Sequence, residues 1–103
     1  MLNVNGCPCC DLWREENFDK IKKDLIHFSN LFMIYKWNGI PTVISREHII
    51  ELPKETWGHV LKKVRDLYGN QARILWDDSR SKFSARLPED HWCGVISVPK
   101  RLY

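Results

Sequence analysis

Two cysteines separated by two residues, Cys7 and Cys10, constrain this chain more than any other feature. Their spacing suits one half of a tetrahedral zinc site, so the other half must come from across the fold. The best candidates for the remaining ligands are His48 together with either His91 or Cys93. We therefore expect a small zinc-binding domain in which the segment from Cys7 to Cys10, a zinc knuckle, is held against segments far along the sequence.

The size and composition are those of one ordinary globular domain, spanning residues 1–103. Hydrophobic residues make up 44% of the chain and charged residues 28%, which allows a modest core that a bound metal would help to stabilise. The first six residues lack a basic start followed by an apolar run, so no signal peptide is expected. We expect a cytoplasmic protein, and in a reducing compartment paired cysteines are more often metal ligands than disulfides. Two core thiols are the alternative interpretation of the knuckle.

The charge and hydropathy of the chain bear on its partners. A formal net charge of +3 permits contacts with phosphate groups but is too mild to indicate nucleic-acid binding by itself. No apolar run approaches the roughly 20 residues of a membrane-spanning helix, so no membrane interaction is expected. Five tryptophans are many for this length, and some of them are expected to line a groove or a partner surface.

Runs of β-forming residues alternate with turn signals along much of the chain. Ser29-Asn30 and Asn38-Gly39 are two such signals, and the second is the strongest turn dipeptide in the sequence. Residues 18–28 also show a helical period, so a helix there is the alternative to a strand. A short helix is expected over residues 11–17, and the expected strands are 20–28, 31–37, 42–45, 72–76 and 92–98.

Residues 53–68 carry the clearest helix pattern. Pro53 suits the first turn, where its missing N–H costs nothing, and Gly69-Asn70 supplies a stop signal. Apolar residues recur at helical spacing and form one face, which comprises Trp57, Val60, Leu61, Val64, Leu67 and Tyr68. The order of elements predicts an α+β domain, with a mostly antiparallel sheet and the long helix packed on one face.

Three stretches of the chain resemble the histidine triad (HIT) family and the related galactose-1-phosphate uridylyltransferases. Members often begin with a Cys-Pro-x-Cys knuckle, which is similar to Cys7-Pro8-Cys9-Cys10 here. Residues 39–49 resemble the family's third strand with the histidine that follows it, and residues 91–100 resemble the strand that carries the triad. The resemblance covers nearly the whole chain. It implies a HIT-like antiparallel sheet of about five strands, one long helix and an N-terminal zinc knuckle.

The resemblance also implies a set of metal ligands. In zinc-binding members these are the knuckle cysteines, the histidine after the third strand and the first triad histidine, which correspond here to Cys7, Cys10, His48 and His91. The same residues satisfy the ligand types and spacing of a structural zinc site with no open position. Cys9 and Cys93 are possible substitutes.

The catalytic part of the family pattern is missing. In the family, the second triad histidine attacks the α-phosphate and is transiently nucleotidylated. Cys93 stands two residues after His91, where that histidine would be. The family's triad strand ends in a proline, which corresponds to Pro99 here. An alignment counted back from that proline places Trp92, Gly94 and Ile96 at the three triad positions, so it also contains no histidine. Cys93 is the remaining candidate for a catalytic nucleophile, although a structural or ligand role is favoured for it.

A rim of basic and aromatic residues around the corresponding cleft is a candidate nucleotide site. Arg80 and Lys82 are candidates for phosphate contacts, and Trp92, with Trp76, for stacking on a base. A solvated basic surface is the alternative interpretation of the two cations.

These features predict a binding or regulatory module for a protein or nucleotide partner, stabilised by structural zinc and lacking the catalytic triad. A divergent nucleotide hydrolase or nucleotidyltransferase that uses Cys93 is one alternative. A zinc-containing nucleic-acid-binding protein is the other. Because members of the family commonly form dimers through the long helix and the sheet edge, a homodimer is a further expectation.

Overall fold

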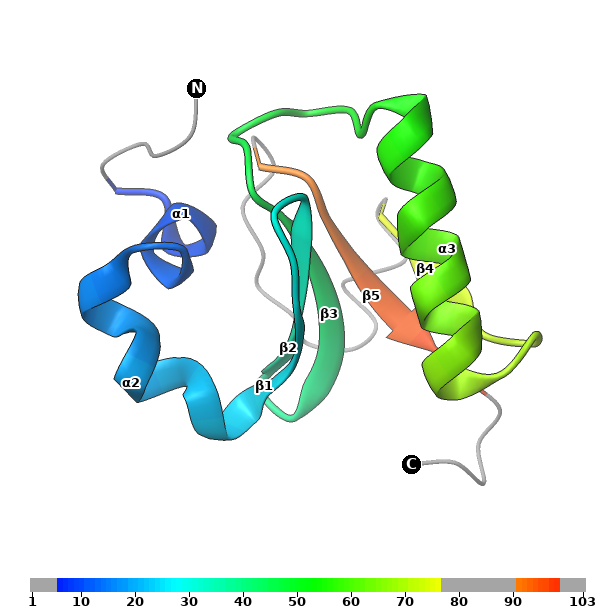
Figure 1. Ribbon diagram of the computed structural model, residues 1–103, viewed down its shortest axis with the longest axis horizontal. Coiled ribbons are helices and arrows are strands. Elements are labelled where there is room, and N and C mark those ends of the chain that lie inside the picture. Colours follow the sequence, from blue (N-terminus) through cyan, green and yellow to red (C-terminus); the bar gives the residue numbers. More distant parts are fainter. Residues whose placement is uncertain (1–5, 77–90, 99–103) are drawn as a thin grey trace.

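A computed structural model of the chain describes residues 6–76 and 91–98. Short helical segments come first, then a group of strands, the long helix and two further strands (Figure 1). The helical segments are α1 (Pro8–Leu12), the 3-10 turn η1 (Glu15–Asn17), α2 (Phe18–Ile21), the 3-10 turn η2 (Lys22–Asp24) and α3 (Lys54–Tyr68). The strands are β1 (Leu25–Phe28), β2 (Phe32–Trp37), β3 (Ile40–Ser45), β4 (Arg73–Leu75) and β5 (Cys93–Ser97).

Within these described ranges the strands form one five-stranded antiparallel sheet in the order β1-β2-β3-β5-β4. The β2–β3 hairpin turns at Asn38 and Gly39, whose φ angles of 53° and 82° suit the mirror-image turn that two-residue hairpins prefer. β5 comes from far along the sequence and lies between β3 and β4, with Cys93 opposite Ile44. This register brings the start of β5 next to the end of β3.

Helices cover both faces of the sheet (Figure 1). Successive side chains of a strand point to opposite faces, so Phe32 and Ile34 of β2 pack in the cluster that contains the buried side of α3. Met33 packs in a second cluster, on the face covered by α1 and α2, together with Ile21 and the cysteines. The cysteines are therefore part of a small core of their own, on the face opposite the long helix.

The predicted antiparallel sheet with one long helix is confirmed for the part of the chain that the structure describes. α3 confirms the helix expected over residues 53–68, with Pro53 as its N-cap and Gly69, at φ 92°, after its last turn. The other strands expected after residue 30 are confirmed as β2, β3, β4 and β5, with shifts of one or two residues at their ends. No helix in residues 6–76 and 91–98 is long and apolar enough to cross a membrane.

Two predictions near the start of the chain are wrong in detail. The strand expected over residues 20–28 forms only from Leu25, because α2 and η2 precede it. The alternative prediction, a helix, describes the residues before Leu25 better. Ile21 is buried beneath the knuckle, and this packing overrides its strand propensity. The helix expected over residues 11–17 is instead α1, which starts at Pro8, followed by the separate turn η1. Proline suits the first position of a helix because its missing N–H has no partner there anyway.

Candidate metal centre

Four side chains from separate segments converge at one place in the fold: Cys7, Cys10, His48 and His91. Their ligand atoms all lie within 4.8 Å of one another. The two cysteines and His91 are buried, and His48 is half-buried. The cluster could therefore hold a metal ion, and it consists of the four residues that the sequence predicts as ligands.

One turn of helix brings the two cysteines together. Cys7 is the N-cap residue of α1, and Pro8 occupies the first helical position. The Asp11 N–H donates a hydrogen bond to the Cys7 carbonyl over 3.1 Å and closes this turn. Residues three positions apart lie on the same side of a helix, so the sulfurs of Cys7 and Cys10 can share one ion.

Hydrogen bonds between β3, its following loop and β5 hold the two histidine-bearing segments together. The Ser45 N–H donates to the Trp92 carbonyl over 3.3 Å, and the Trp92 N–H donates to the Ile49 carbonyl over 2.6 Å. The Ser45 hydroxyl adds a contact of 3.2 Å to the same Trp92 carbonyl. His48, in the loop after β3, is thereby placed beside His91, which comes shortly before β5.

The ring of His91 is oriented by a further hydrogen bond. Its Nε2 lies 2.7 Å from the backbone carbonyl oxygen of Ser45. A carbonyl oxygen can only accept, so Nε2 carries the proton and Nδ1 keeps its lone pair. That Nδ1 lies 3.3 Å from His48 Nδ1, 3.4 Å from Cys10 Sγ and 3.5 Å from Cys7 Sγ. His91 thus presents the lone pair of Nδ1 to the other three residues of the cluster, in a tautomer suited to metal coordination.

The donor atoms are two sulfurs and two imidazole nitrogens. His48 Nδ1 lies 3.3 Å from Cys10 Sγ, and the two imidazole rings meet edge to face at 86°. Thiolate and imidazole together select soft and borderline metal ions rather than Mg²⁺ or Ca²⁺, which take oxygen ligands. The geometry of the cluster therefore fits a transition-metal ion.

The other two cysteines form a separate pair. Cys9 Sγ and Cys93 Sγ are 2.9 Å apart, and their residues are 0% and 1% exposed. The sequence leaves open whether His91 or Cys93 completes the metal site. In the described part of the chain the cluster includes His91, whereas Cys93 contacts Cys9. As a candidate nucleophile, Cys93 is enclosed in the hydrophobic cluster beneath α1.

The structure describes only part of the predicted nucleotide rim. Trp92 is 4% exposed and meets Trp57 edge-on, with ring centroids 5.3 Å apart. A base could stack on Trp92 only after this packing opened, and such stacking stays a prediction. Trp76 is 52% exposed and also packs edge-on against Trp57, with ring centroids 4.9 Å apart. Arg80 and Lys82 lie outside the described residues.

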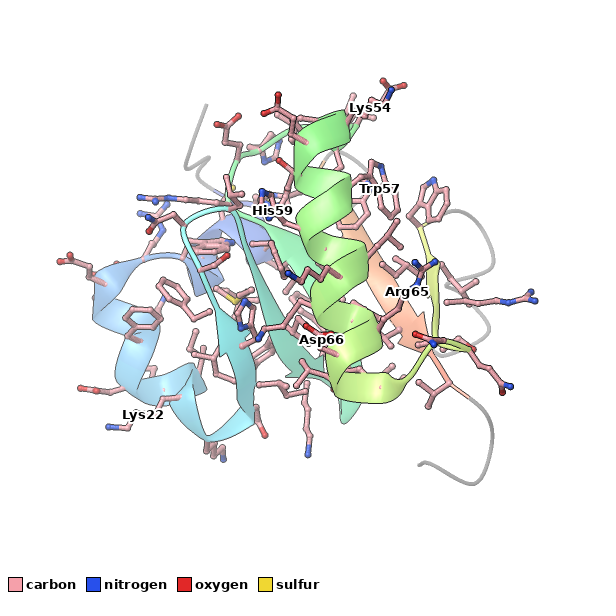
Figure 2. The ribbon with its side chains drawn as sticks, turned by 45° about the vertical axis from the view of Figure 1, so that its right-hand side comes forward. Lys22, Lys54, Trp57, His59, Arg65 and Asp66 are labelled. Atoms are coloured by element: carbon pink, nitrogen blue, oxygen red, sulfur yellow. The ribbon has the colours of Figure 1, made fainter. Side chains whose placement is uncertain are left out.

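A hollow of about 490 Å³ lies beside these rings, as expected for tryptophans that line a groove. Its lining is mostly apolar and includes Ile50, Leu52, Trp57, Leu61, Trp76 and Trp92, with Glu51 also on its wall. Figure 2 shows Trp57 on the side of α3 towards β4, away from His59. The sequence indicated that Trp76 and Trp92 share a site, but it assigned Trp57 to the apolar face of the helix and did not show that this ring also lines the hollow.

Comparisons of this chain with models of protein families, with curated proteins and with solved structures found no match. The candidate metal centre is therefore defined by the geometry of this chain's own residues.

Proposed function

We propose that this protein is a small zinc-stabilised module with a HIT-like fold, which binds a protein or nucleotide partner and lacks a catalytic triad. The observation that carries the proposal is the convergence of two cysteines and two histidines in one cluster, which joins α1, the loop after β3 and the start of β5. A metal held by all three segments would stabilise a fold whose cysteine-containing core is small.

The spacing of the ligand atoms supports zinc as the ion. Zinc bonds of about 2.3 Å to sulfur and about 2.05 Å to nitrogen in a tetrahedron separate two nitrogens by about 3.3 Å, and nitrogen from sulfur by about 3.6 Å. The two histidine nitrogens are 3.3 Å apart, and three of the four nitrogen–sulfur distances of the cluster run from 3.3 to 3.5 Å. All the ligand atoms lie within 4.8 Å of one another. Four protein ligands fill the coordination of zinc and leave no position for a substrate, which supports a structural role.

The HIT-like part of the proposal is supported by the order of the elements and by the ligand positions. A knuckle, a hairpin, a strand ending near His48, one long helix and a last strand starting near His91 follow one another in the chain. Cys93 and Val95 occupy the positions two and four after His91, and both are buried. Neither is a histidine, and this supports a binding module over a nucleotidyl transferase.

The tryptophan-lined hollow supports a site for the partner. Trp76 presents half of its surface to solvent, and Ile50 is 72% exposed at the same hollow. Exposed apolar residues gathered at one concave place favour ligand or protein binding. A nucleobase or an apolar side chain of a protein would fit such a lining equally well.

The zinc content and the expected lack of nucleotide turnover can be tested on the same purified protein. Elemental analysis should give one zinc per chain, and a protein that carries no metal and ignores chelators would contradict the metal centre. Incubation with adenosine phosphoramidate and with dinucleoside polyphosphates should give no turnover. Turnover that is abolished in Cys93→Ala or His91→Ala would instead establish the divergent hydrolase alternative.

The partner is tested through the intrinsic fluorescence of the tryptophans. If the partner is a nucleotide, adenosine monophosphate should change the emission of the wild type, and Trp76→Ala should lose this response. Trp37→Phe is the matched control, because Trp37 is half-buried and packs in the other cluster. If the partner is a protein, the wild type should capture it from the native host's lysate and Trp76→Ala should not. Failure of both experiments would exclude the hollow as the binding site.

A further inference from the structure

Cys9 and Cys93 form a pair of sulfur atoms in contact, and neither residue belongs to the metal cluster. Their sulfurs are 2.9 Å apart although the residues are 84 positions apart in sequence. Both side chains are buried among Ile21, Met33 and Ile44. Two cysteines from distant segments therefore face each other in a dry, closely packed place.

The proposed metal centre positions both members of this pair. Cys9 lies in α1 between the ligands Cys7 and Cys10, and Cys93 lies two residues after the ligand His91. Residues two apart in an extended segment point to the same side. Fixing the four ligands around one ion therefore also fixes where the two remaining sulfurs meet.

Metal binding also decides which cysteines can pair. Four cysteines can be joined into two disulfides in three ways. When Cys7 and Cys10 are bound to a metal, their sulfurs are occupied, and the one pairing left within the chain is Cys9 with Cys93. The geometry already places these two sulfurs in contact.

We propose that Cys9 and Cys93 are a redox site, which forms a reversible disulfide while the metal stays on its four ligands. With hydrogen peroxide as the oxidant, each thiol gives up one proton and one electron. The S–S bond forms, the O–O bond breaks, and two molecules of water leave. A dithiol reductant restores both thiols by exchange. The inference rests on the proposed metal centre, because the bound metal is what keeps Cys7 and Cys10 out of the reaction.

The burial of both sulfurs sets the rate of this reaction. An oxidant reaches Cys9 only when α1 lifts from the sheet, because the residue is 0% exposed. Oxidation is therefore slow compared with that of an exposed thiol. Once formed, the disulfide joins α1 to β5, two residues from His91, through which the metal also links this part of the chain to α1. The oxidised chain keeps its knuckle in place and retains the metal longer.

The test uses purified protein whose metal content has first been measured. Treatment with hydrogen peroxide should lower the intact mass by two hydrogen atoms, and subsequent alkylation under denaturing conditions should add two groups fewer than in the reduced protein. A non-reduced peptide map should show Cys9 joined to Cys93. The metal content should not change. Cys9→Ala and Cys93→Ala should each lose the mass change, whereas the map of the wild type decides the pairing even if a variant folds poorly.

Release of the metal to a chelator supplies a second readout. The oxidised wild type should release its metal roughly tenfold more slowly than the reduced form, because the cross-link closes a long loop of the chain. A metal-loaded protein that forms no such disulfide, or that joins Cys7 to Cys10 and loses its metal, would overturn the redox site. Absence of metal before oxidation would overturn the proposed function instead, so the two failures are distinguishable.

Discussion

His91 and Ser45 are joined by a hydrogen bond of 2.7 Å from the imidazole Nε2 to the backbone oxygen. Ser45 is the last residue of β3, so this bond ties a ligand that precedes β5 to the neighbouring strand. It selects the tautomer of His91 and turns Nδ1 towards the other ligands. The ligand cluster is in this way connected to the sheet through a backbone oxygen.

This bond predicts the nitrogen through which His91 coordinates the metal. In the metal-loaded protein, the proton should be on Nε2 and the metal on Nδ1, because the Ser45 carbonyl can accept but cannot donate. Nitrogen NMR of the histidine rings distinguishes the two tautomers. Coordination through Nε2 of His91 would contradict the described orientation of the ring.

Loss of one ligand should remove the metal, whereas loss of a histidine elsewhere should not. His48→Ala leaves three ligands and should lower metal affinity by at least about 10- to 100-fold, the loss seen for outer-shell partners of metal ligands. His59→Ala is the matched control, because His59 is exposed on α3. Metal content after dialysis measures both variants. Equal metal content in the two would show that His48 is not a ligand.

Removing the metal should lower the melting temperature. Free metal at a thousand times its dissociation constant stabilises the folded chain by about 4.1 kcal/mol, which for a domain of this size corresponds to roughly 15 to 30 °C in Tm. Thermal unfolding monitored by circular dichroism, with and without a chelator, measures the difference. An unchanged Tm after complete removal of the ion would mean that the metal does not stabilise this fold.

Gly94→Ala should destabilise the protein although the change is small. A Cβ at this position of β5 would clash with the Ile74 side chain and come within 3.1 Å of the Trp92 ring, which lies over the glycine. Overpacking of this kind costs about 1 to 3 kcal/mol in the free energy of unfolding. Metal content should stay the same, because neither neighbour is a ligand.

Gly58→Ala is the opposite case and serves as the control for Gly94→Ala. Gly58 lies inside α3 and is exposed, and a Cβ there meets nothing within 4 Å. Alanine should therefore stabilise the helix by about 0.5 to 1 kcal/mol, because it loses less backbone entropy than glycine. Chemical denaturation measures both variants, and a destabilised Gly58→Ala protein would show that this side of the helix is covered.

His27 should hold its proton more weakly than an ordinary histidine. Burial lowers its pKa below the usual 6.5, and the positive charge of Lys63 lowers the pKa further. The unfolded chain then binds this proton more readily, so the contribution of His27 to stability falls as the pH drops below about 6.5. NMR titration of the ring measures the pKa directly.

Replacing Lys63 separates the two causes of this shift. Lys63→Met should raise the pKa of His27 only part of the way to its usual value, because burial is the larger cause. Lys36→Met is the control, because that exposed lysine belongs to β2 and is not among the causes of the shift. An ordinary pKa for His27 in the wild type would contradict the burial of its ring.

Local patterns in the sequence predicted the features that depend on neighbouring residues. The turn at Asn38-Gly39 follows from two residues that tolerate positive φ, and α3 follows from a helical repeat between Pro53 and Gly69. Cys7, Cys10 and His48 were also predictable as ligands, because the chain has few cysteines and histidines and the knuckle has a spacing suited to zinc. Residue type left the fourth ligand open between His91 and Cys93, and the resemblance to the HIT family favoured His91. In each case the information lies within a short stretch or in residue type.

The residue at which β1 starts could not be predicted from the sequence. Ile21 and Leu25 are both apolar, and nothing in their immediate neighbours separates the end of α2 from the start of the strand. The boundary depends on burial beneath the knuckle, which is contributed by residues more than ten positions away. Secondary-structure propensity, which depends on residue type, contains no information about such a contact.

What the sequence determined by itself is the chemistry of the chain: two thiols in a knuckle, two histidines able to complete their set, and one long amphipathic helix. Only the tertiary structure decided how these parts meet. The pairing of β3 with β5 places Cys93 opposite Ile44, and so directs its sulfur to Cys9 while His91 completes the cluster. The physical reason for this division is that residue type and spacing specify only what a side chain can bind. The register between strands distant in sequence, which depends on the packing of the whole core, specifies what lies within its reach.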